Sequence, residues 1–159
     1  MPKRTEQNFF IICDNLRSLY NVGSIFRTSD AMKVDKIFLC GITGTPEQKG
    51  LQKVALGAEN SVAWEHVKNA WQLVDKLKKQ GFQIVALEQT PSSVDIKRFK
   101  PKFPLVLIVG NEVNGVAPSL LKRSDACVEI AMNGMKESLN VSVAYGIASY
   151  ALNGFRRLK

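Results

Sequence analysis

The sequence has few of the side chains from which metal and redox sites are built. Its 159 residues include three cysteines and one histidine, and no two cysteines follow the CxxC spacing. A zinc site needs several such ligands at short spacings, and a Ser-His arrangement needs a histidine with partners. His66 is too isolated for either, so no metal is expected. We interpret Cys13, Cys40 and Cys127 as reduced core residues of a cytoplasmic protein.

We also expect no secretion signal, and the sequence shows no internal repeats or low-complexity tracts. Residues 1–7 are polar and charged, and the first apolar run is the short, strand-like FFIIC. One stretch lacks charge, since the eighteen residues from Ser138 to Phe155 include no Asp, Glu, Lys or Arg. That length raises the question of a membrane span, but polar and small residues interrupt the stretch. We interpret it as a buried or dimer-facing helix and expect no membrane segment.

Acidic side chains are outnumbered by basic ones. The chain has 22 Lys and Arg against 14 Asp and Glu, a formal net charge of +8. This excess favours a polyanionic partner, most simply nucleic acid, although solubility alone is an alternative explanation. The densest basic run spans residues 97–102, where an aromatic lies among four positive charges. It is compatible with contact to a phosphate backbone and equally with a solvated linker.

Length and composition predict one domain with a single sizeable core. Segments typical of strands alternate with segments typical of helices, which predicts an α/β fold: a mostly parallel sheet with helices on both faces. Strands are predicted at residues 9–14, 36–41, 61–66, 82–88, 105–110 and 126–130. Helices are predicted at 21–33, 69–80, 117–122 and 138–156, and residues 42–60 as a long loop with at most one short helical turn.

Polar residues follow three of the predicted strands, at residues 88–90, 110–112 and 132–134. Ligands of such sheets bind beyond the carboxyl ends of the strands. The turn at 110–115 lacks the GxGxxG spacing and the Lys-Ser/Thr of a phosphate-binding loop, so a phosphate cradle is weakly supported. After the third strand, Ser138 is expected to open the last helix, whose first turn could receive a polar ligand.

A fourth polar segment begins at Asn21, the expected N-cap of the first helix. Gly23 leaves room for another group to approach the first turn. Arg27 lies off the apolar stripe of that helix and could present its guanidinium to a phosphate or a carboxylate. The ordinary alternative is a helix cap followed by a surface arginine. Glu112 could pair with a base, with Arg27, or with nothing.

Together these segments resemble the SpoU-type branch of the SPOUT RNA methyltransferases. The family's first motif, Asn-x-Gly-x-x-x-Arg, is similar to the segment with Asn21, Gly23 and Arg27. Its second motif, Gly-x-Glu-x-x-Gly, resembles Gly110, Glu112 and Gly115. Its third motif, a strand end, a glycine loop and Ser-Leu-Asn-Val-Ser, resembles Ile130, Met132, Gly134 and residues 138–142. The three motifs follow the family's order over residues 9 to about 158, and departures such as Ala131 in place of proline remove no polar group with a proposed role.

The resemblance implies a C-terminal trefoil knot, a homodimer through the C-terminal helix and knot region, and S-adenosylmethionine as cofactor without a metal. It implies cofactor contacts from Leu87, Glu88, Gly110, Asn111, Ile130, Met132, Ser138 and Leu139. It further implies methylation of a ribose 2′-hydroxyl in RNA, with Arg27, Ser138, Asn140, Asn21 and Glu112 as catalytic candidates. Since an arginine is hardly ever deprotonated, we interpret Arg27 as a residue that orients phosphate and stabilises developing charge.

Two other functions stay open. The first is a catalytically silent RNA-binding module on the same fold, against which the set of catalytic candidates argues. The second is a generic nucleotide-binding α/β domain, which leaves the Ser-Leu-Asn segment and the uncharged helix unexplained. Residues 1–159 are predicted to form one methyltransferase domain without a separate RNA-binding domain, so its basic surface and residues 42–60 are expected to recognise RNA. Transfer RNA is slightly preferred over ribosomal RNA, because a small dimer could grip one compact RNA.

Overall fold

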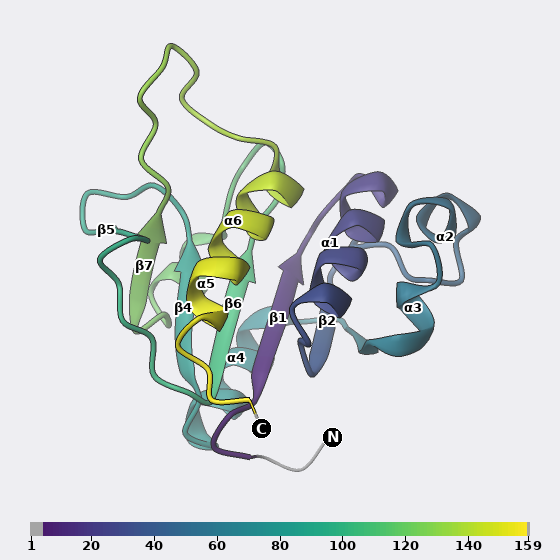
Figure 1. The fold of residues 1–159 in the computed structure, drawn as a ribbon, viewed down its shortest axis with the longest axis horizontal. Coiled ribbons are helices and arrows are strands. Elements are labelled where there is room, and N and C mark those ends of the chain that lie inside the picture. Colours follow the sequence, from purple (N-terminus) through teal and green to yellow (C-terminus); the bar gives the residue numbers. More distant parts are fainter. Residues whose placement is uncertain (1–4, 159) are drawn as a thin grey trace.

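The computed structural model describes residues 5–158, which form a seven-stranded sheet with helices on both faces (Figure 1). The strands are β1 (Phe9–Asp14), β2 (Lys36–Cys40), β3 (Ala63–Val67), β4 (Gln83–Leu87), β5 (Val94–Asp95), β6 (Leu105–Val109) and β7 (Ala126–Glu129). All neighbouring pairs are parallel, in the order β3-β2-β1-β6-β4-β7-β5. The predicted α/β class with a mostly parallel sheet is therefore confirmed.

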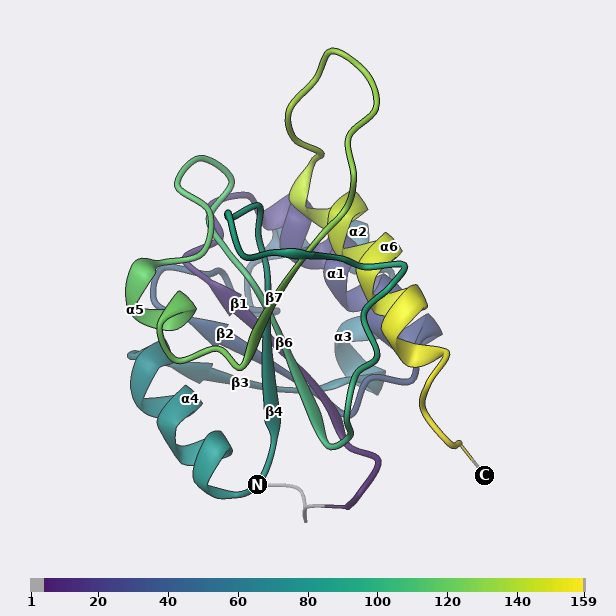
Figure 2. The same cartoon turned by 90° about the vertical axis from the view of Figure 1, so that its left-hand side faces the viewer.

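The central strands β1 and β6 are buried along their whole length and supply two hydrophobic cores. Successive side chains of a strand point to opposite faces, so Phe9 and Ile11 join one core while Phe10 and Ile12 join the other. On the first face lie α1 (Leu19–Ala31), α2 (Lys49–Ala55), α3 (Ala58–Ser61) and α6 (Val141–Asn153), and on the second lie α4 (Ala70–Lys79) and α5 (Pro118–Leu121) (Figure 2).

The first helix begins earlier than expected. Its N-cap is Ser18, whose Oγ accepts a hydrogen bond from the Asn21 amide at 3.2 Å, so the prediction of Asn21 as N-cap is wrong. Serine caps a helix about as well as asparagine, and this leaves the buried Asn21 side chain for contacts outside the helix. The room at Gly23 is used by α2, since a Cβ there would lie 2.7 Å from the Leu51 carbonyl oxygen.

The two helices α2 and α3 occupy most of residues 49–61, so the prediction of residues 42–60 as a loop with at most one short turn is wrong. The glycines and the proline of this segment favoured a loop. Leu51, Ala55 and Ala58 nevertheless bury their side chains in the core beside α1, and such packing supplies most of the stability of a short helix. Leu56 and Gly57 take left-handed conformations, which separates α2 from α3.

The last helix begins at Val141 with Asn140 as N-cap, so the expected start at Ser138 is wrong. Residues 130–140 instead form a loop that projects beyond the body of the molecule (Figure 1). The connection from β4 to β6 lies across the chain that leaves β7. Gln89 Nε2 donates to the Glu137 carbonyl oxygen at 2.8 Å, and the Ile96 amide donates to that of Glu129 at 2.8 Å. This crossing is consistent with the trefoil knot, which stays a prediction.

The chain itself covers only one side of the uncharged helix α6. Tyr145, Ala148 and Leu152 are fully buried, whereas Ile147 and Tyr150 are 43% and 73% exposed. None of the helices in residues 5–158 is long and apolar enough to span a membrane. The cytoplasmic location stays a prediction. The expectation that residues 1–7 carry no secretion signal falls partly on residues 1–4, which lie outside the described residues.

Candidate functional site

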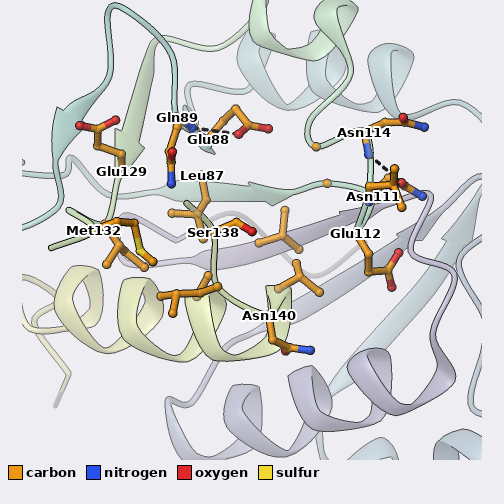
Figure 3. Close-up of a pocket in the computed structure, with 18 residues that line it drawn as sticks. Leu87, Glu88, Gln89, Asn111, Glu112, Asn114, Glu129, Met132, Ser138 and Asn140 are labelled. Carbon is orange, nitrogen blue, oxygen red and sulfur yellow. Dashed lines mark hydrogen bonds between the residues drawn. The ribbon is translucent and has the colours of Figure 1, made fainter. Parts of the chain in front are cut away.

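A cavity of about 340 Å³ opens at the carboxyl ends of β4, β6 and β7, beside the start of α6 (Figure 3). Its walls are residues 87–89 after β4, residues 109–115 around the turn after β6, Glu129, Ile130 and Met132 at the end of β7, and residues 138–141 with Ala144. The volume lies in the range of about 300–1,000 Å³ that small-molecule sites occupy. The cavity also lies where open parallel sheets bind their ligands.

The charged side chains that line this pocket are all acidic. They are Glu88, Glu112 and Glu129, and none of the described lining residues is Lys, Arg or His. This contrasts with the net charge of +8 on the whole chain. Negatively charged phosphates would be repelled strongly by these carboxylates in a partly enclosed site. The pocket therefore suits a positively charged ligand better than one with phosphates. The lining therefore argues against a generic nucleotide-phosphate site.

Glu112 connects the turn after β6 to the start of α1. Its Oε2 accepts a hydrogen bond from the Arg17 amide at 2.9 Å, and its Oε1 accepts from the Ser18 amide at 3.0 Å and from Asn21 Nδ2 at 3.1 Å. Burial alone would raise the pKa of Glu112, but these hydrogen bonds outweigh it and lower the pKa. Glu112 is thus ionised and holds the turn after β6 against the start of α1. Its hydrogen-bond partners among residues 5–158 do not include Arg27.

Asn140 extends this connection to the last helix. Its Nδ2 donates to Asn21 Oδ1 at 3.1 Å, while its own Oδ1 accepts from the Ser142 amide at 2.9 Å and from Ser142 Oγ at 2.6 Å. The three segments that carry Glu112, Asn21 and Asn140 are therefore held in one hydrogen-bonded row. Figure 3 shows Asn140 and Glu112 at the same end of the pocket.

Glu88 fixes the opposite wall. Its carboxylate accepts from the Gln89 amide at 2.9 Å and from the Val116 amide at 2.9 Å, which ties the end of β4 to the turn after β6. Gly115 has a φ of +70°, and a Cβ there would collide with Glu88 Oε2. Gly110 packs directly on the Gly115 main chain, where a side chain would also collide. The two glycines thus let the turn close over Glu88.

The structure brings together almost all of the residues predicted for the site. The eight cofactor candidates all line the pocket: Leu87, Glu88, Gly110, Asn111, Ile130, Met132, Ser138 and Leu139. Of the catalytic candidates, Glu112, Ser138 and Asn140 line it, and Asn21 lies directly behind them. Arg27 does not line it, because its exposed side chain belongs to the outer face of α1. The roles of these residues stay predictions.

Sequence reasoning missed several residues of the site. Glu129 lines the pocket, and the amides of Arg17 and Ser18 hold Glu112. The signal for Glu129 was its place directly before Ile130 at a strand end. The signal for Ser18 was its place three residues before Asn21, since serine is a preferred N-cap. No local signal marks Arg17 as a partner of Glu112.

Residues 8–150 match the SpoU rRNA methylase family. The tRNA (guanosine(18)-2′-O)-methyltransferase of Aquifex aeolicus is 34% identical over 148 residues, which cover 93% of this chain and 70% of the relative. The putative TrmH family tRNA/rRNA methyltransferase YacO of Bacillus subtilis is 29% identical over 153 residues, which cover 93% of this chain and 59% of that protein.

Solved structures are also similar. The crystal structure of the A. aeolicus TrmH/SpoU tRNA modifying enzyme has a TM-score of 0.85 at 35% identity, and the match covers 96% of this chain and 77% of that one. The AdoMet-bound rRNA methyltransferase from Sinorhizobium meliloti has a TM-score of 0.86 at 28% identity, covering 92% of this chain and 56% of that one. The chain thus spans between 56% and 77% of the length of these relatives.

Proposed function

This chain belongs to the SpoU rRNA methylase family, and from that premise we propose that it transfers a methyl group from S-adenosylmethionine to a ribose 2′-hydroxyl of RNA. The observation that carries the proposal is a pocket at the carboxyl ends of three strands with acidic charges alone in its lining. S-adenosylmethionine carries a sulfonium and an ammonium against one carboxylate, so its net positive charge suits such a lining. A relative named for 2′-O-methylation and an AdoMet-bound neighbour support the same chemistry.

The pocket residues fit this cofactor. The main chain at Leu87, Gly110, Ile130 and Leu139 would hold the adenine and methionine parts, with Asn111, Met132 and Ser138 beside them. Glu129 would face the positive groups, and Glu88, whose carboxylate is held by the amides of Gln89 and Val116, would add negative charge nearby. When bound, S-adenosylmethionine supplies an activated methyl group. Among the described residues no cluster of His, Cys, Asp and Glu is suited to hold a metal ion.

The protein must align the ribose hydroxyl with that methyl and help to remove its proton. Ser138 is exposed at the pocket, and because Asn140 caps α6, the Ser138 hydroxyl is free to contact the ribose (Figure 3). Asn21 and Asn140 shape the site through their mutual hydrogen bond. Glu112 acts as a positioning residue, since its carboxylate is engaged by the start of α1.

A homodimer accounts for Arg27 and for the exposed face of α6. The helices α1 and α6 lie side by side on one face of the sheet (Figure 1), joined by a hydrogen bond between Ser29 Oγ and Tyr145 Oη at 2.6 Å. A second copy seated on α6 and the knot region would cover Ile147 and Tyr150. Because Arg27 lies outside its own chain's pocket, we assign it to the pocket of the second copy, where it would orient phosphate and stabilise developing charge.

The substrate is proposed to be transfer RNA in preference to ribosomal RNA, since a small dimer can grip one compact RNA. The names of the relatives include both classes. In this proposal residues 1–159 act as one domain.

The test is to incubate the purified protein with methyl-labelled S-adenosylmethionine and separate pools of unmodified tRNA and rRNA, and then to digest the RNA to nucleosides. Label on a 2′-O-methyl nucleoside from one pool is the expected result, and it also names the substrate class. Label on a base would overturn the ribose assignment. If the protein binds the cofactor and RNA but transfers no label, it is a silent RNA-binding module on this fold.

A further inference from the structure

The side chains of Arg17 and Tyr20, a cation and an aromatic ring, lie beside the pocket and do not contribute to the core or to an ion pair of residues 5–158. Arg17 is exposed, and the ion pairs of residues 5–158 all involve other basic side chains. Tyr20 is 63% exposed at the start of α1. The charge and the ring are therefore both available to a partner that approaches this end of the sheet.

The site itself fixes the position of both residues. The Arg17 amide is held by Glu112 Oε2 at 2.9 Å, so the Arg17 side chain leaves the main chain at the rim of the pocket. Tyr20 directly precedes Asn21, which bonds to both Glu112 and Asn140. Successive helix residues point about 100° apart. While Asn21 faces the hydrogen-bonded row, Tyr20 therefore faces outward from the same turn.

Further apolar side chains are exposed along this edge. Val113, beside Glu112 in the turn after β6, is 78% exposed, and Ile42 after β2 is 65% exposed. The Ile42 amide donates to Asn15 Oδ1 at 3.0 Å, which places Ile42 near the segment that leads to Arg17. Gathered apolar exposure around a pocket marks a contact surface. Together with an unpaired cation and an aromatic ring, it fits a nucleic acid better than a purely ionic partner.

We propose that Arg17 and Tyr20 bind the nucleotide to be methylated, with its base stacked on the Tyr20 ring and an adjacent phosphate on the Arg17 guanidinium; this rests on the proposed function. Aromatic stacking of this kind requires a base that has left a helical stack. Arginine matches phosphate oxygens with two parallel donors. The substrate is therefore an unpaired nucleotide in an RNA loop, and Tyr20 and Arg17 are specificity residues for it.

Binding of RNA by the full chain, measured with S-adenosylhomocysteine present, tests this directly. The probes are a short stem-loop RNA and a fully paired RNA of the same length. Tyr20→Ala should weaken stem-loop binding about tenfold or more and leave duplex binding unchanged, because only an unpaired base stacks on the ring. Tyr20→Phe keeps the ring and should bind like the wild type.

Arg17→Ala keeps the amide that bonds to Glu112, so the pocket should stay intact. Its affinity should fall for the stem-loop, and the slope of log affinity against log salt should become shallower by about 0.7, as expected for one lost phosphate contact on a single strand. Lys79→Ala removes one charge from the exposed end of α4 on the opposite face and should leave stem-loop binding unchanged.

The outcomes separate this inference from the proposed function. If the wild-type protein transfers methyl groups, and Tyr20→Ala and Arg17→Ala both bind the stem-loop as tightly as the wild type, the inference is overturned and the proposed function stands. If the wild type transfers no methyl but Tyr20→Ala still loses stem-loop binding, the RNA contact stands and the function fails. A change in oligomeric state or cofactor affinity in Tyr20→Ala would assign Tyr20 to the interface or the fold, and would overturn its role in RNA binding.

Discussion

Among single residues, Glu112 does the most to join separate parts of the site, because its carboxylate holds residues 17–21 against the turn after β6. In Glu112→Gln, one oxygen becomes an amide that faces main-chain donors, so the start of α1 should lose its fixed position. We expect kcat for methyl transfer to fall about 10- to 100-fold, since small misplacements cost that much in catalysis, and cofactor affinity to change less. Glu137→Gln, on the exposed loop, is the matched control. A wild-type kcat in Glu112→Gln would show that methyl transfer does not need the hydrogen bonds between Glu112 and residues 17–21.

Asp14 should make the stability of the protein fall as pH rises, whereas a carboxylate in an ion pair makes stability rise with pH. It is 6% exposed at the end of β1, and burial raises its pKa. The folded state therefore holds this proton more tightly than the unfolded state, and stability falls as pH rises from the ordinary aspartate value of about 3.9 through the raised pKa. Asp14→Asn should have the higher Tm at neutral pH, and the difference should vanish below the ordinary value. Thermal unfolding over a pH series measures this, and a difference that is independent of pH would refute the assignment.

The packing of α1 against α2 depends on the absence of a side chain at Gly23. A Cβ at Gly23 would lie 2.7 Å from the Leu51 carbonyl oxygen and 2.9 Å from Val54 Cβ, so α2 would have to move. Gly23→Ala should cost about 1–3 kcal/mol in the free energy of unfolding, although alanine favours a helix over glycine by about 1 kcal/mol. Gly134→Ala, where a Cβ meets open space, is the control for chemical unfolding. Equal stability of Gly23→Ala and the wild type would mean that α2 is loosely attached.

Strands were predictable from the sequence where a run of apolar residues is long enough to be buried. β1 and β6 are such runs, and their predicted bounds agree with the structure to within one residue. β5 has two residues, too few to show any pattern, and it exists because it pairs with β7. The helix α2 was hidden by glycines that favour loops, and what stabilises it is burial of Leu51 and Ala55 against distant residues.

The position of the candidate site was predictable for a different reason. In a parallel sheet the carboxyl ends of the strands meet at one edge, so the polar segments after β4, β6 and β7 had to converge. The bond between Glu112 and the Arg17 amide had no such signal, because the two residues are 95 positions apart and a main-chain donor leaves no trace in the sequence. The direction of Arg27 also required the structure, since helical phase alone does not say which element covers which face.

For the whole molecule, the exposed apolar face of α6 is what the proposed dimer must bury. Ile147 is 43% exposed in the middle of this face, so Ile147→Lys should fold normally and yet place a charge in the interface. Sedimentation should give a dimer for the wild type and a monomer for the variant, and methyl transfer should fall with the dimer. Lys79→Glu, at the exposed end of α4 on the opposite face of the sheet, is the control. A variant that stays dimeric would place the interface on another surface.

Whether the two copies share a site can be decided with mixed dimers. Arg27 lies outside the pocket of its own chain, whereas Ser138 lines it. If Arg27 serves the other copy, a dimer of one Arg27→Ala chain and one Ser138→Ala chain has one complete site and one with both changes. The purified mixed dimer, made with two different tags, should then reach about half of the wild-type rate, because a two-fold dimer has two equivalent sites. Each parent homodimer should be nearly inactive. If the residues act within one chain, both sites of the mixed dimer are damaged, and its rate should stay at the level of the parents.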